Sequence, residues 1–346
     1  MPDVPERPAF MALPDLASRL LAGSVVAAND ELFAQRENLI RPEPPVFVAH
    51  EFGHKGKVYD GWETRRRREP GHDWTIVRLG VPGVVHGVVV DTAWFTGNYP
   101  PHISVEAALV EGYPSADELE LADWVDLVAK SPARGDTANA YDVHDERIWT
   151  HVRLSIYPDG GVARLRVHGE PAPDPRFLTG TVDLAALENG GRLVDCSDAF
   201  YTSPQNLIMP GRALSMGEGW ENARRRDDGN DFAVFRLADE GVVRHVEIDT
   251  SYFVGNAPGW VRLSACHASG QVPETVGAAE PLGGADWWDL VAKTRSQPDT
   301  RHRFVVDDSR PVTHVRLDVY PDGGLARLRV WGDLTPAALG ALATPT

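Results

Sequence analysis

The sequence is an internal duplication, and this feature constrains the fold more than any single motif does. Residues 60–79, which contain Gly-Trp-Glu and a run of arginines, recur as residues 218–237 at a constant spacing of 158 positions. Residues 150–167 recur near the end of the chain as residues 313–330. Repeats of this length are each large enough to bury a hydrophobic core. The chain should therefore fold as two similar domains.

A short segment rich in proline separates the copies. Residues 169–175 read Gly-Glu-Pro-Ala-Pro-Asp-Pro, a composition typical of a stiff linker. We place the first domain at residues 13–170 and the second at residues 178–333, each beginning with a short helix.

The charge and the cysteine content limit the partners and the compartment. The 346 residues carry a formal net charge of −16, which argues against nucleic acid and anionic membranes as partners. The two cysteines suggest no disulfide framework and favour a reducing compartment. The N-terminal segment lacks the pattern of a secretory signal, and no apolar run reaches the roughly 18 residues of a membrane span. We expect a cytoplasmic protein.

Most of the regular structure should be β. Residues 74–79 and 84–91 are rich in β-branched residues and are divided by Pro82-Gly83, which predicts two strands. Residues 103–109 alternate between apolar and polar, as in a half-buried strand. Residues 150–167 predict a β-hairpin around Pro-Asp-Gly-Gly. Residues 122–130 favour a short helix or a packed loop. The predicted fold class is all-β, with two tandem jelly-roll sandwiches.

Within the predicted hairpin, the apolar side chains should face the core. The polar ones should lie on an exposed or interfacial face, with a contribution to an anion pocket as the alternative. The core set comprises Val152, Leu154, Ile156, Ala163, Leu165 and Val167, and the polar set comprises His151, Arg153, Arg164 and Arg166.

The arginine run is the strongest chemical signal. Guanidinium groups bind carboxylates through two parallel hydrogen bonds, so Arg65 to Arg68 form a candidate anion site. A solvated basic loop is the alternative. Asp91 and Asn98 lie on a predicted loop after a strand, where they serve either a site or a turn.

A zinc motif also occurs. Residues 50–54 read His-Glu-Phe-Gly-His, which matches the pattern of zinc hydrolases. That pattern binds metal on a helix, whereas prolines and glycines surround it here. We therefore predict no metal site, without excluding a divalent cation, and no other cofactor.

Several of these segments resemble the allantoicase family in both copies. They include residues 38–45, 60–67, 71–74 and 95–101, and the hairpin at 157–166. The resemblance covers nearly the whole chain. It implies two jelly-roll domains of the galactose-binding-like type, an oligomer of identical subunits, and amidinohydrolase activity that cleaves allantoate to ureidoglycolate and urea in purine degradation.

Allantoate carries one carboxylate and two ureido groups, which suggests roles for residues of the first copy. Glu63 and His72 are the predicted acid and base, with Asp60 or Asp73 orienting the histidine. Arg66 and Arg67, with Arg65 in reserve, are predicted to bind the carboxylate. Asp91 and Asn98 would contact the ureido groups and Trp62 would form an apolar wall. An internal salt-bridge network is the structural alternative for these residues.

The two copies differ at the predicted base. His72 corresponds to Asn230, so the first copy is the better catalytic candidate. Two other functions stay open: a binding module of twin jelly rolls for a small anionic or sugar ligand, and a zinc peptidase using His50, Glu51 and His54.

Overall fold

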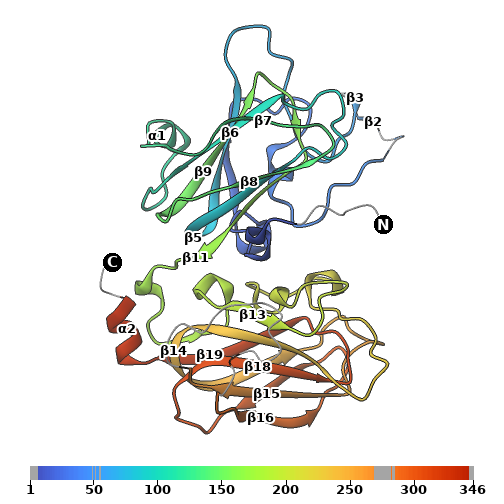
Figure 1. The fold of residues 1–346 in the computed structure, drawn as a ribbon, viewed down its shortest axis with the longest axis vertical. Helices are drawn as coiled ribbons and strands as arrows, with labels where there is room; N and C mark the ends of the chain where they lie inside the picture. The colour runs from blue at the N-terminus through green and yellow to red at the C-terminus, as the bar shows by residue number, and fades with distance from the viewer. Residues whose placement is uncertain are drawn as a thin grey trace. The chain divides into compact units, whose positions relative to one another are not determined.

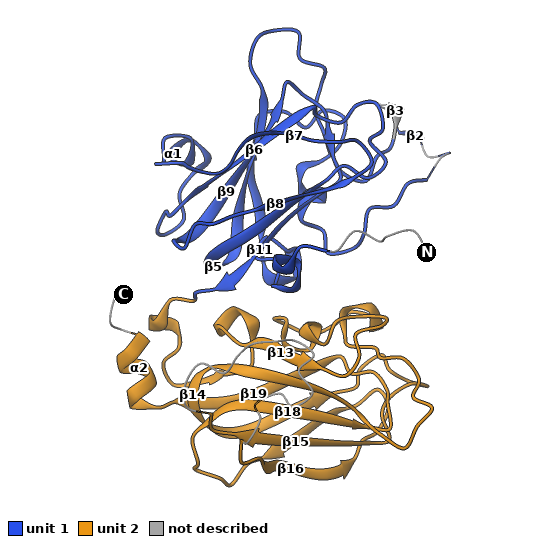
Figure 2. Ribbon diagram, viewed as in Figure 1, with its two compact units in different colours: residues 1–172 blue, residues 173–346 orange. Residues whose placement is uncertain are grey.

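The protein consists of two compact units, residues 1–172 and residues 173–346 (Figure 2). The computed structural model describes residues 7–48, 50, 52–53, 56–268, 282 and 285–342. Strands dominate both units and the helices are short (Figure 1). The predicted fold class, an all-β chain of two sandwich domains, is confirmed.

One long strand organises unit 1. Strand β5 (Asp73–Asp91) pairs with β1 and β9 along its first half and with β8 and β11 along its second half. Its pairing with β9 shifts register between Arg78 and Gly83. The two strands predicted for this stretch are therefore one, because Pro82-Gly83 lies at a bend inside a continuous strand. β5 belongs to both layers of the sandwich.

The other strands of unit 1 surround β5. The main sheet has the order β1-β5-β9-β6-β7, with β8 and β11 also on β5. Their bounds are β1 (Ser24–Ala28), β6 (His102–Ala108), β7 (Val125–Pro132), β8 (Ala138–Asp142), β9 (Ile148–Tyr157) and β11 (Arg164–Pro171), and two small two-stranded sheets join β4 (Trp62–Glu63) to β10 (Gly161–Val162) and β2 (Phe52–Gly53) to β3 (Gly56–Lys57).

Unit 2 repeats this plan around strand β14 (Asp231–Asp249). It pairs with β13 and β18 along its first half and with β17 and β19 along its second half. The remaining strands are β12 (Thr181–Asp183), β13 (Arg192–Cys196), β15 (Trp260–Cys266), β16 (Trp288–Arg295), β17 (Arg301–Val305), β18 (Val312–Tyr320) and β19 (Arg327–Leu334).

The predicted hairpin at residues 150–167 is wrong as a pairing. β9 and β11 are both strands, but β9 pairs with β5 and β6, whereas β11 pairs with β5 alone. The turn between them carries the chain from one layer of the sandwich to the other. A local turn signal cannot distinguish this crossover from a hairpin.

Helices play a small part in the fold. Residues 122–130, predicted as a short helix or packed loop, contribute most of strand β7, and its counterpart is β16. The α-helices are α1 (Ala116–Glu120) and α2 (Pro336–Leu342), and the 3₁₀ helices are η1 (Ala9–Ala12), η2 (Arg19–Leu21), η3 (Arg36–Ile40), η4 (Pro175–Phe177), η5 (Leu187–Asn189), η6 (Pro204–Ile208) and η7 (Met216–Glu218). The helix at the start of each repeat is thus a single 3₁₀ turn, η2 or η5.

The core follows the predicted alternation. All six apolar residues assigned to the core from residues 150–167 are completely buried. His151 and Arg164, predicted on an exposed face, are also buried, each only 1% exposed. Arg164 tolerates burial because its guanidinium donates to Oδ2 of Asp60 and to three backbone carbonyls.

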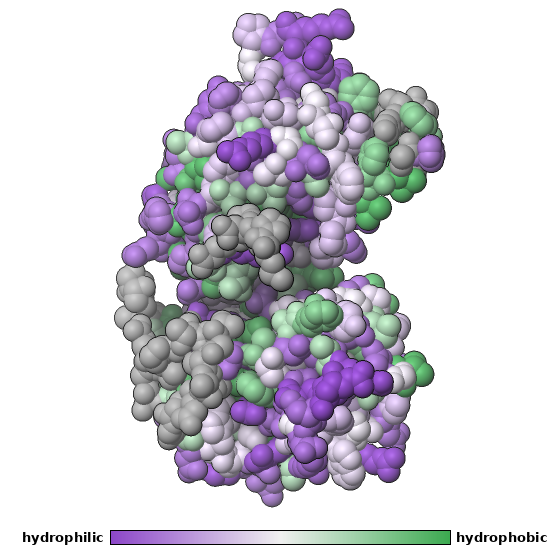
Figure 3. Space-filling model, turned by 45° about the vertical axis from the view of Figure 1, so that its right-hand side comes forward, coloured by the Kyte–Doolittle hydropathy of each residue, from purple (hydrophilic) through white to green (hydrophobic). Residues whose placement is uncertain are grey.

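The surface mixes polar and apolar side chains, as the face in Figure 3 shows in purple and green. Large exposed apolar residues of unit 2 include Phe200, Tyr201 and Leu214. Within the described part of the chain, no helix has the length and apolar character needed to cross a bilayer.

Candidate functional site

A polar network fixes the arginine run at the start of β5. Nη1 of Arg67 donates to Oδ1 of the buried Asp73 at 2.8 Å, and the amide of Asn29 donates to the same oxygen at 3.0 Å. The backbone N–H of Arg67 donates to Asp159 at 2.7 Å. Charge-assisted bonds of this kind hold a guanidinium in one orientation. Arg67 is therefore a fixed cation.

Arg67 lies at the boundary of two hollows on unit 1. The first has a volume of about 670 Å³ and the second about 660 Å³, and Asn29 and Arg67 line both. Each volume falls in the range of roughly 300–1,000 Å³ that is usual for small-molecule sites. The first hollow is lined by Asn29, Arg67, Gly71, His72, Trp74, Ser104, Glu106, Asp126, Lys130, Arg153 and Tyr157, and the second by Asn29, Asp30, Leu32, Phe33, residues 65–69 and Asp73.

His72 stands in the wall of the first hollow. Its ring lies 4.6 Å from the ring of Tyr157, centroid to centroid. Burial lowers the pKa of His72, and the nearby charges of Arg67 and Arg153 lower it further, against the opposing effects of Glu106 and Asp73. A lowered pKa favours the neutral imidazole, which is the form that can accept a proton.

Side chains of β6, β7 and β9 form the floor of the first hollow. Register pairs Glu106 with Arg153 on one side and with Asp126 on the other, so these side chains share a face. The Arg153 guanidinium donates two hydrogen bonds of 2.8 Å to the carboxylate of Glu106. The ammonium of Lys130 lies 4.2 Å from the ring centroid of Tyr157. Positively and negatively charged side chains therefore line the first hollow together.

Of this floor, the sequence prediction considered only Arg153 for an anion pocket, and it favoured an exposed or interfacial face. Alternation marks these side chains as the outward face of a sheet, which is normally solvated. The sequence carried one indication that this face differs between the copies. Ser104 and Glu106 correspond to Arg262 and Ser264 in the second copy.

Glu63 and His72 do not share a hollow. Oε1 of Glu63 accepts a hydrogen bond from Nδ2 of Asn98 at 2.6 Å, and Glu221 and Asn256 form the same pair at 2.9 Å. Burial raises the pKa of Glu63, while the bond from Asn98 opposes the rise. Because both units keep the pair, it ties β4 or its counterpart to the loop after the long strand. The predicted acid–base pairing of Glu63 with His72 has no geometric support.

Three further predicted site residues have structural partners instead. Trp62 has no exposed surface, and its indole N–H donates to the carbonyl of Asp30 at 2.7 Å, so it cannot form the wall of a cavity. Asp60 accepts from Arg164 at 2.7 Å and does not orient His72. Asp91 accepts from the backbone N–H of Ala93 at 2.8 Å, in the turn chemistry considered as its alternative.

Arg65 and Arg66 differ in whether a described carboxylate holds the side chain. Nε of Arg65 lies 2.6 Å from Oδ2 of Asp30, which fixes that side chain at the rim of the second hollow. Arg66 is exposed and lines the same hollow, with no ion pair to any described residue. Arg67, by its position, reaches both hollows.

The zinc motif is only partly described. His50 is exposed, and Phe52–Gly53 forms strand β2 in a two-residue pairing with β3, so this part of the motif is not helical. Glu51 and His54 lie outside the described residues. Among the described residues, no group of three or more His, Cys, Asp or Glu is arranged to hold a metal.

Comparisons with known proteins agree along the whole chain. The family model described as Allantoicase repeat matches residues 14–172 and 182–335. A probable allantoicase of Nocardia farcinica is 55% identical over 94% of this chain and 95% of its own length. The allantoicase of Dictyostelium discoideum is 40% identical, over 94% of this chain and 89% of its own.

A solved structure matches the fold as well. The crystal structure of allantoicase from Saccharomyces cerevisiae superposes with a TM-score of 0.78 and 34% identity, covering 92% of both chains. With a family model that spans both units and relatives that align over nearly their full lengths, the chain belongs to the allantoicase family.

Proposed function

We propose that the chain hydrolyses allantoate to ureidoglycolate and urea in purine degradation, at the hollows of unit 1 that Asn29 and Arg67 both line. Family membership supports the substrate. The observation that carries the site is the placement of His72, a histidine with a lowered pKa, beside the fixed Arg67 in one hollow. A neutral base and a cation suit a substrate that has a carboxylate next to the carbon to be attacked.

The reaction replaces one C–N bond with a C–O bond at the central carbon of allantoate. The remaining ureido nitrogen pushes electron density toward that carbon as the bond to the other ureido group breaks. Water supplies the oxygen of ureidoglycolate, His72 accepts the proton that water loses, and a proton passes to the departing nitrogen to give urea. A positioned acid–base group is typically worth about 10² to 10⁴ in rate. By this mechanism the chain hydrolyses a C–N bond.

The deciding experiment is urea release by the purified full-length chain. With allantoate as substrate, we expect stoichiometric urea and ureidoglycolate, measured by coupled ammonia production after urease treatment. Binding of allantoate without urea release would contradict hydrolysis and leave a binding module.

The proposal has three further parts. We propose that the enzyme needs no cofactor, acts in the cytoplasm and assembles from identical subunits. Two free cysteines, Cys196 and Cys266, suit a reducing compartment. Full activity after chelation would support the absence of a metal, while light scattering at several concentrations would report the number of subunits.

A further inference from the structure

Arg67 and Arg225 occupy equivalent positions and are held by the same inner contacts. Nη1 of Arg67 lies 2.8 Å from Asp73, and Nη1 of Arg225 lies 2.6 Å from Asp231. The backbone N–H groups of the two arginines donate to Asp159 and Asp322, at 2.7 and 2.8 Å. In both units this leaves the edge formed by Nε and Nη2 for another partner.

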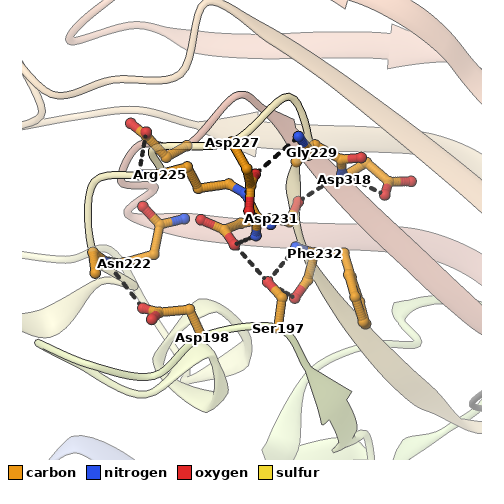
Figure 4. A network of polar contacts seen from close by, with 12 residues as sticks. Ser197, Asp198, Asn222, Arg225, Asp227, Gly229, Asp231, Phe232 and Asp318 are labelled. Carbon is orange, nitrogen blue, oxygen red and sulfur yellow. Dashed lines mark hydrogen bonds and ion pairs between the residues drawn. The ribbon is translucent and has the colours of Figure 1, made fainter. Parts of the chain in front are cut away.

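In unit 2 that edge is already occupied by a carboxylate. Oδ1 of Asp227 accepts from Nε of Arg225 at 2.9 Å, and Oδ2 accepts from Nη2 at 3.0 Å. The backbone N–H of Gly229 adds a third bond to Oδ1, at 2.9 Å (Figure 4). This is the two-pronged geometry with which a guanidinium recognises a carboxylate.

In unit 1 no described carboxylate binds the same edge. The position of Asp227 is taken by Glu69, which is exposed and forms no ion pair with Arg67 in the described structure. Nε of Arg67 is enclosed and finds no hydrogen-bond acceptor among the described residues. An enclosed N–H without a partner is unfavourable, so it marks a place where an acceptor is missing.

The Nε–Nη2 edge of Arg67 lies against Gly71, one of the residues that line the first hollow. A Cβ atom added to Gly71 would lie 2.9 Å from both Nε and Nη2 of Arg67, so the edge borders the bare side of this glycine. Gly71 and His72 line the first hollow together with Arg67. A carboxylate held at this edge would therefore place the rest of its molecule beside the histidine.

We infer that the Nε–Nη2 edge of Arg67 is the carboxylate clamp of unit 1, and that Asp227 fills the corresponding clamp of unit 2 from within the chain. The ligand class is a small carboxylate, and its identity as allantoate rests on the proposed function. Arg65 cannot serve in the same way because Asp30 already holds its Nε.

Kinetics of two substitutions test the clamp. Arg67→Lys keeps the charge beside Asp73 but loses the two-pronged edge, so we expect KM for allantoate to rise about tenfold or more. Glu69→Asp installs the residue of unit 2, and the tethered carboxylate should compete with substrate. It should raise KM and leave kcat nearly unchanged, a split that a loss of stability would not produce.

Arg225→Lys and Asp227→Glu are the matched controls in unit 2 and should leave both constants at the wild-type values. A wild-type KM in Arg67→Lys would overturn the clamp. If the wild-type chain released no urea, the proposed function would fail, and calorimetric binding of malonate would still test the clamp. Binding to wild type that Arg67→Lys abolishes supports it, and no binding to wild type overturns it.

Discussion

The two units share a fold and an inner network but differ on the outer face of one sheet. In unit 1 that face carries His72, Ser104 and Ser155, all beside the first hollow or on the strands that line it. In unit 2 the same positions are Asn230, Arg262 and Asp318. The longer and charged side chains of unit 2 bind one another.

These contacts join side chains whose counterparts in unit 1 line the first hollow or lie on its strands. Nε of Arg262 lies 2.6 Å from Asp289, and Asn230 donates to Asp318 at 2.9 Å. Arg316 also donates to Asp318, at 2.9 Å, and its guanidinium lies 4.0 Å from the ring centroid of Phe232. The duplication thus kept the residues that hold the fold in both units, while the side chains on this outer face differ between them. If the proposed site is correct, these differences confine it to unit 1.

The largest effect is expected from exchanging the histidine. His72→Asn gives unit 1 the residue of unit 2 and removes the base, so kcat for urea release should fall by about 10² to 10⁴. Asn230→His is the control and should not change the rate. If Asn230→His doubled activity, or His72→Asn kept it, the assignment of the site to unit 1 would be wrong.

The second-largest effect is expected from filling the first hollow. Ser104→Arg should place a guanidinium near Asp126, as Arg262 lies near Asp289, and fill the first hollow. We expect kcat/KM for allantoate to fall about tenfold or more, because the substrate must displace this ion pair. Arg262→Ser serves as the control, and equal losses in the two variants would show that the effect is not local.

The acid side of the pH profile provides a third measurement. Because burial and two arginines lower the pKa of His72, kcat/KM should stay high as pH falls through 6.5 and decline only below that value. Unit 2 has no titrating group at this position. A decline centred above pH 6.5 would mean that another group is the base.

A smaller effect should be equal in the two units. Glu63→Gln and Glu221→Gln weaken matched bonds to Asn98 and Asn256, so each should lower the free energy of unfolding by about 1 kcal/mol. Urea release should stay close to wild type in both. Selective loss of activity in Glu63→Gln would restore the predicted catalytic role of Glu63.

The smallest difference between the units is expected from two buried histidines. Burial lowers the pKa of His151 and of His314 to about 4, so the unfolded chain binds protons that the folded chain excludes. Stability is then lost as pH falls from about 6.5 toward 4, at about 1.4 kcal/mol per pH unit for each histidine. Denaturation of His151→Gln and His314→Gln should show equally flattened profiles.

Much of the architecture could be predicted from the sequence, because duplication and apolar alternation are visible along the chain. The alternation identified Val152, Leu154 and Ile156 as core, since strand periodicity is a local property. The pairing of β9 was not predictable in this way. A turn of Pro-Asp-Gly-Gly fixes a reversal of the chain, whereas the partner strand depends on contacts distant in sequence.

The site was predicted only in part for a similar reason. Arg67 and His72 lie in the repeated segment of residues 60–79, and the structure brings them to one hollow. Asp60 and Trp62 lie in the same segment but face Arg164 and Asp30, which no local pattern reveals. The sequence pattern identified the segment that contains Arg67 and His72, while burial decides which of its side chains can meet a ligand.

The long strand β5 has a consequence for how the site is maintained. It begins at Asp73, the anchor of Arg67, and is hydrogen-bonded to neighbours in both layers of the sandwich. Neither layer can open without disturbing β5, to which the strands of the other layer are also hydrogen-bonded. Because Asp73 holds Arg67 at the start of this strand, the first hollow should lose its shape only when the entire sandwich unfolds.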